Sequence, residues 1–123
     1  MTNQEIFNEL GDMGTLVLLY LEMAGADGET SEEEALIILK AASCFTDQDV
    51  TQFFDGAFKV KASLSFNDRL AYLKAGLGYF AENLPADTKK NILHSLTLIA
   101  GADGNIHDNE SALYKLAYSY LNA

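Results

Sequence analysis

A five-residue segment, Ala-Gly-Ala-Asp-Gly, occurs twice in this chain, at residues 24–28 and again at residues 100–104. Each copy follows an apolar segment and precedes an acidic one. Asp27 leads to Glu34 at the same spacing at which Asp103 leads to Glu110. Because self-similarity within a chain is the mark of a repeated structural unit, the repeat limits this protein to folds with an internal duplication.

The spacing of the apolar residues predicts helices and no strands. Proline occurs once, at Pro85, and several windows place apolar residues three and four positions apart. We expect an all-α, compact single domain over residues 1–123. Its seven expected helices cover residues 3–10, 13–24, 32–45, a stretch beginning at 47, 66–81, a stretch beginning at 85, and 108–121. The helix over 13–24 is apolar nearly all round, which is typical of a central buried element.

The charge of the chain restricts its partners. The chain has eight lysine and arginine residues and 18 aspartate and glutamate residues, which gives a net charge of −10. A phosphate backbone or an anionic membrane surface would be repelled by such a protein. We therefore expect no nucleic-acid partner, and we expect cations or basic proteins to bind instead.

Several further expectations concern location and packing. The start of the chain, MTNQEIFNEL, has no basic or continuously apolar region, and the longest apolar stretch, residues 16–21, is too short to cross a membrane. We expect a cytoplasmic protein without direct membrane insertion. The single cysteine, Cys44, lies in an apolar helical pattern, which predicts a small buried side chain. Helical spacing also predicts core positions for the aromatic residues Phe53, Phe54, Phe58, Phe66, Tyr72 and Tyr79.

The duplicated turns supply the candidate site. Asp27 and Glu34 in the first copy, and Asp103 and Glu110 in the second, are candidate metal ligands, while Gly28 and Gly104 allow the sharp turns. Against a twelve-residue calcium loop the first and third places lack oxygen ligands, so neither turn is an ordinary EF-hand. If the two turns meet across a pseudo-twofold axis, their four carboxylates share one divalent cation. Oxygen ligands favour calcium or magnesium over zinc.

The same residues have a second, purely structural interpretation. Ser31 with Glu34 fits a capping box, and Asp27 and Asp103 could bond backbone amides within their own turns. Two carboxylates about 6 Å apart repel by on the order of 3 kcal/mol at an effective dielectric near 20, so a cluster of four needs a cation or protons. Both interpretations stay open at this point.

Enzymatic activity has little support in the sequence. No phosphate-binding glycine loop occurs, no serine stands near a credible base, and His94 and His107 lack a partner at metal-ligand spacing. Metal-assisted hydrolysis lacks a nameable general base. We expect a non-enzymatic protein, either a cation-binding domain or a metal-independent acidic module that binds a basic partner. The sequence leaves the oligomeric state open.

The residues also resemble a known family. The duplicated Asp-Gly turns, the Phe53-Phe54 segment between them and the ending IAGADGNIHDNESALYKLA are similar to the TerB-like family linked to tellurite resistance, over residues 16–121. The resemblance implies an all-helical duplicated domain that gathers the acids of both turns on one face, binds metal ions and works alongside membrane and stress-response partners. It implicates Asp27, Glu34, Asp103 and Glu110, with Glu33 and Asp108 as secondary candidates. Compared with better-known members, we expect this chain to lack a basic N-terminal extension.

Overall fold

The structure, a computed structural model, describes residues 2–24, 32–100 and 108–122, and it describes the backbone alone for Glu33, Asp108, Asn109 and Glu110. The six helices are α1 (Asn3–Ala24), α2 (Glu32–Ser43), α3 (Thr51–Ser63), α4 (Phe66–Asn83), α5 (Ala86–Ala100) and α6 (Asp108–Leu121). No strand occurs among the described residues, so the predicted all-α class is confirmed.

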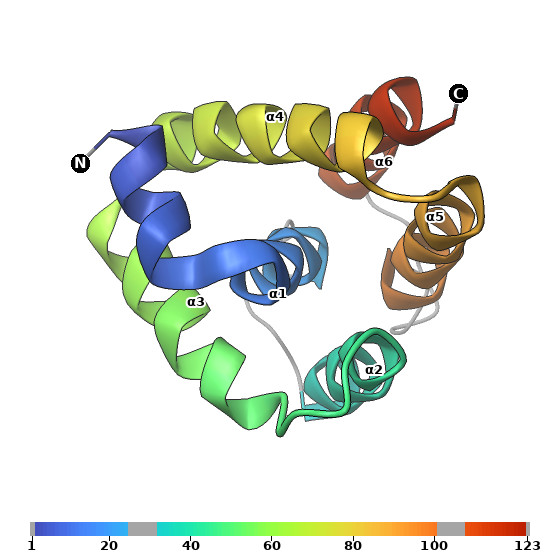
Figure 1. The fold of residues 1–123 in the computed structure, drawn as a ribbon, viewed down its shortest axis with the longest axis horizontal. Coiled ribbons are helices and arrows are strands. Elements are labelled where there is room, and N and C mark those ends of the chain that lie inside the picture. The colour runs from blue at the N-terminus through green and yellow to red at the C-terminus, as the bar shows by residue number, and fades with distance from the viewer. Residues whose placement is uncertain (1, 25–31, 101–107, 123) are drawn as a thin grey trace.

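Helix α1 forms the centre of the domain. Figure 1 shows its C-terminal half surrounded by the other helices, and it packs against α2, α3, α4, α5 and α6. Every residue from Gly14 to Ala24 is buried. Each fully buried leucine there stabilises the fold by about 1.5–3 kcal/mol through the apolar surface that it removes from water. The apolar run at residues 16–21 therefore sits at the heart of the core, as predicted.

A kink joins two segments that the sequence predicts as separate helices. Residues 3–10 and 13–24 belong to one helix, α1, whose backbone breaks helical geometry at Gly11 (φ 65°, ψ −171°). This combination of angles is open to glycine and strongly unfavourable for other residues. The chain leaves helical geometry and changes direction at Gly11, so the two predicted helical stretches are present on either side of a kink. Counted together as α1, they give six helices where seven were expected.

The starts of α3 and α4 show how side chains define helix boundaries. Ser65 caps α4, since its hydroxyl accepts a hydrogen bond from the amide of Asp68 (3.1 Å). Helix α3 begins at Thr51 rather than at residue 47, because the carboxylate of Asp49 accepts hydrogen bonds from the Thr51 amide (3.0 Å) and hydroxyl (2.7 Å). These bonds to the charged form lower the pKa of Asp49.

Of the aromatic side chains predicted for the core, Phe54 and Tyr72 are buried, but three others lie on the surface. Phe58, Phe66 and Tyr79 are exposed, with Phe66 at 60%. Helices α3 and α4 lie outside α1 and bury only the stripe that faces it. An aromatic residue beside that stripe keeps the helical spacing but not the burial, so the prediction for these three residues was wrong.

One buried ion pair links the centre to the periphery. The Arg69 guanidinium on α4 donates from Nε to the carboxylate of Glu22 on α1. Its Nη1 donates to the carbonyl oxygens of Lys61 (3.2 Å) and Leu64 (2.7 Å) at the end of α3. A buried charge needs such partners, since an unpaired one strongly destabilises a fold. Arg69 thus ties α1, α3 and α4 together.

Candidate functional site

The two copies of the repeated segment join helices in the same way. Helix α1 ends at Ala24 and α5 ends at Ala100, which are the first residues of the two copies. The next helices, α2 and α6, begin at equivalent places, Glu32 and Asp108, so Glu34 and Glu110 are each the third residue of a helix. The predicted arrangement of helix, Asp-Gly segment and helix is therefore present twice.

The helices that carry the two copies also pack against one another. Helix α1 contacts α2, α5 contacts α6, and α1 contacts both α5 and α6. The duplication thus forms one packed unit rather than two separate hairpins. Asp27, Gly28, Asp103 and Gly104 lie outside the described residues, so their proximity stays a prediction.

Glu34 is the candidate ligand whose surroundings the structure describes. Glu34 is only 5% exposed, although it lies in the first turn of α2, close to the point where the described residues resume. The positive end of the helix dipole favours a carboxylate at this place. A buried carboxylate also requires polar partners or a cation. Burial of Glu34 fits both the cation site and the helix cap.

No complete metal site lies within the described residues. No three histidine, cysteine, aspartate or glutamate side chains come together as metal ligands among the described side chains, which do not include those of Glu33, Asp108 and Glu110. The described part holds Glu34 but neither of the two turn aspartates. The shared site of Asp27, Glu34, Asp103 and Glu110 therefore rests on the repeat and on the placement of the helices.

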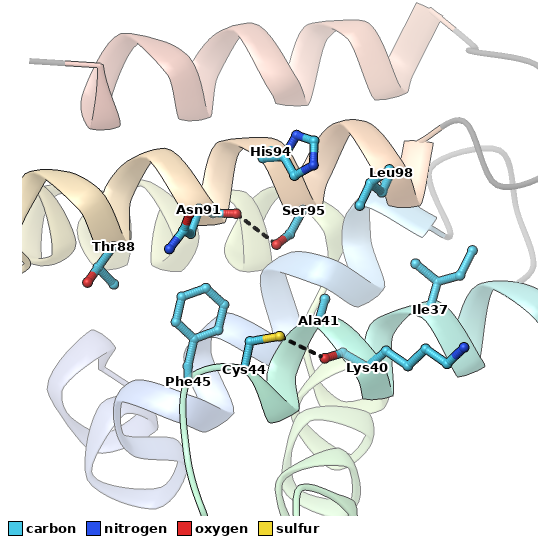
Figure 2. Close-up of a pocket in the computed structure, with 10 residues that line it drawn as sticks. All are labelled: Ile37, Lys40, Ala41, Cys44, Phe45, Thr88, Asn91, His94, Ser95 and Leu98. Carbon is cyan, nitrogen blue, oxygen red and sulfur yellow. Dashed lines mark hydrogen bonds between the residues drawn. The ribbon is translucent and has the colours of Figure 1, made fainter.

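A second feature, which the sequence did not predict, is a groove between α2 and α5 (Figure 2). Its volume is about 800 Å³. We call it the α2/α5 groove, and its ten lining residues are Ile37, Lys40, Ala41, Cys44, Phe45, Thr88, Asn91, His94, Ser95 and Leu98. Polar and apolar side chains from two distant segments meet here, which no pattern within either segment reveals.

Cys44 lies in this groove and not in the core. Helix α2 ends at Ser43, so Cys44 falls in the turn after the helix and is exposed. Its thiol donates a hydrogen bond to the carbonyl of Lys40 (Sγ to O 3.4 Å). The prediction of a buried cysteine was wrong because it extended the helical pattern beyond the true end of α2.

Behind the groove lies a buried tyrosine on α1. The Tyr20 side chain is 0% exposed, and its hydroxyl has no hydrogen-bond partner in the described part of the chain. Burial raises the pKa of the Tyr20 phenol, and the neighbouring Ser95 hydroxyl only partly offsets this. Ser95 itself donates to the carbonyl of Asn91 (2.8 Å). The Tyr20 hydroxyl thus makes no hydrogen bond of ordinary geometry among the described residues, although the Ser95 hydroxyl is a polar neighbour that partly offsets the rise in its pKa.

Comparison with known proteins identifies the family. None of the described helices has both the length and the apolar character of a membrane span. Searches of curated proteins and of solved structures found no match. A family model described as tellurite resistance protein TerB matches residues 16–122, which include both copies of the Asp-Gly segment, residues 16–24 of α1 and the whole of α2 to α6. With its duplicated, all-helical architecture and this match over most of its length, the chain belongs to the TerB family.

Proposed function

We propose that this TerB-family domain is a non-enzymatic protein that binds one divalent cation between its two Asp-Gly turns. Asp27, Glu34, Asp103 and Glu110 would be the carboxylate ligands, with calcium or magnesium favoured over zinc. The observation that carries the proposal is the burial of Glu34 at a helix position that Glu110 repeats in the second copy. The family description supports a role in tellurite resistance or a related stress response.

The chemistry of hard cations explains why two turns are needed. Calcium takes about six to eight oxygen ligands, and magnesium a tighter octahedral set that includes water. One turn supplies two carboxylates, which is too few. Two turns supply four, and carbonyl oxygens and water complete the shell. The cation would offset the mutual repulsion of the carboxylates and hold the two turns in one arrangement.

Calorimetric titration of chelator-stripped protein with calcium, magnesium, manganese and zinc tests the proposal. We expect about one ion per chain. Removal of one charged ligand by Glu34→Gln should weaken binding at least about tenfold, which corresponds to about 1.4 kcal/mol. Glu82→Gln is the matched control, because Glu82 is an exposed carboxylate on α4 and is not part of either repeated segment. This control should bind the ion as the unchanged protein does.

The double variant Asp27→Asn with Asp103→Asn separates the two interpretations of the turns. Loss of binding with unchanged helical circular dichroism supports the cation site. Absence of binding in the unchanged protein, together with unfolding of the double variant, would show that the turn residues are structural caps. The net charge of −10 then favours the second candidate function, metal-independent capture of a basic protein segment, which salt would weaken.

A further inference from the structure

We propose that the α2/α5 groove binds a small organic anion with an apolar body, of the class of medium-chain carboxylates. The groove is formed by the second half of α2, the turn after it, and one face of α5. Its described lining residues all lie outside the Asp-Gly segments, and none of them is a ligand of the proposed cation site, so this inference does not depend on that site.

The charge of the groove favours an anion. The chain has 18 acidic residues, yet none of the ten lining residues that the structure describes is acidic, and one of them is Lys40. Lys40 is exposed and forms no salt bridge with any of the described residues. In a protein of net charge −10, an anion meets least repulsion where carboxylates are absent and an unpaired ammonium is present.

The apolar lining gives room for the body of the ligand. Phe45 and Ala41 on one side, and Leu98 on the other, present carbon surface to the groove, and Leu98 is 53% exposed. The volume of about 800 Å³ falls within the range of about 300–1,000 Å³ that is usual for small-molecule sites. A medium alkyl chain would cover this surface and remove it from water.

Tyr20 locates the head group. Its buried hydroxyl has no partner among the described residues, and its electrostatic neighbours Ser95 and Cys44 both line the groove. Figure 2 shows Ser95 and Cys44 on opposite sides of the gap, with α1 behind it. A carboxylate oxygen that enters between them, as their side chains rotate aside, accepts a hydrogen bond from the Tyr20 hydroxyl. Lys40 lies one helical turn before Cys44. Figure 2 shows its ammonium extended along α2 away from Cys44, so Lys40 must change rotamer to reach the same carboxylate.

Cys44 provides a built-in reporter for this binding, because it is the single cysteine of the chain and is exposed. The first measurement is the rate at which iodoacetamide alkylates Cys44, with and without decanoate. Decanoate is kept below the concentration at which it forms micelles. Calorimetry measures its affinity for the protein. We expect saturating decanoate to slow alkylation several-fold. Lys40→Met, or replacement of decanoate by the neutral decanol, should weaken binding about tenfold, the effect of one charged contact. Lys59→Met, an exposed lysine on α3, is the matched control and should bind normally.

Tyr20→Phe tests the position of the head group. It should weaken decanoate binding about tenfold without lowering the melting temperature, because it removes a hydroxyl that the unliganded protein leaves unpaired. Unchanged affinity in this variant would overturn the placement beside Tyr20. Absence of protection by decanoate, or equal protection by decanol, would overturn the anion site. Slower alkylation at higher protein concentration without decanoate would show instead that a second copy of the chain covers the groove.

Discussion

Helices α1 and α5 lead into the two copies of the same five-residue segment, yet their surroundings differ. Over its last three turns α1 is buried on every side, from Gly14 to Ala24. Over the equivalent residues α5 buries one stripe and exposes another, which includes His94 and Leu98. A duplicated sequence motif therefore does not imply a duplicated environment, because a small domain has room for one helix at its centre.

The equivalent positions show how the sequence records this difference. Counted from the repeated segment, Leu18 of α1 corresponds to His94 of α5, and Leu21 corresponds to Thr97. Both leucines are fully buried, whereas His94 and Thr97 are exposed. The central helix, α1, is apolar at positions where the peripheral helix, α5, is polar. The exposed side of α5 is therefore available to line the α2/α5 groove.

The largest effect should come from replacing side chains at equivalent positions of the two helices by alanine. Leu18→Ala should lower the free energy of unfolding by about 2–5 kcal/mol, since it leaves a cavity in the centre of the core. His94→Ala should change it by less than about 0.5 kcal/mol, because the site is exposed. Urea denaturation of both variants measures the two values. Similar losses would show that α5 is as central to the fold as α1.

A second, smaller effect should appear where the two helices differ in shape. Gly11→Ala should lower the free energy of unfolding by about 1–3 kcal/mol, because alanine is strained at φ 65° and ψ −171°. Steric obstruction is not the cause, since no atom outside the local chain lies within 4 Å of the added Cβ. Asp87 is the equivalent residue of α5 and lies in an ordinary first helical turn, so Asp87→Ala is the control. Thermal and urea unfolding of both variants would test this. Equal losses would argue against backbone strain as the cause.

The smallest effect should be a gain in stability. Tyr20→Phe should stabilise the protein by up to about 1 kcal/mol, because the buried hydroxyl lacks a partner in the described structure. Its counterpart in α5, Leu96, carries no such group. A loss of stability in urea would instead reveal a partner for the hydroxyl, such as an ordered water.

The pH dependence of unfolding gives a second measurement on the same pair of proteins. The pKa of Tyr20 is raised above its ordinary value near 10, so the phenol stays protonated in the folded protein after it has begun to ionise in the unfolded chain. Stability should therefore fall as the pH rises above 10. The fall should be shallower in Tyr20→Phe, with the remaining slope due partly to Tyr72, whose pKa burial also raises.

Helical spacing and capping residues predicted most of the architecture. Helix α4 begins at Phe66 as expected, and the apolar run at 16–21 is central. The same spacing wrongly predicted that Phe66 and Cys44 are buried. Periodicity identifies the face of a helix that packs, but it shows neither where the packed surface ends nor which residue is the last of the helix. For the candidate site, the repeat predicted equivalent positions for Glu34 and Glu110, which the helix boundaries confirm. The cation itself remains a proposal.

By itself the sequence determined the local features: the all-α class, the duplication, several helix starts and the identity of the central helix. These depend on side chains close together in the chain, through hydrophobic periodicity and capping. The tertiary structure alone decided which faces of the outer helices are buried, that Glu22 pairs with Arg69, and that Cys44 and Ser95 line one groove in front of Tyr20. These features join residues far apart in sequence, and only the packing of whole helices around α1 determines which of them meet.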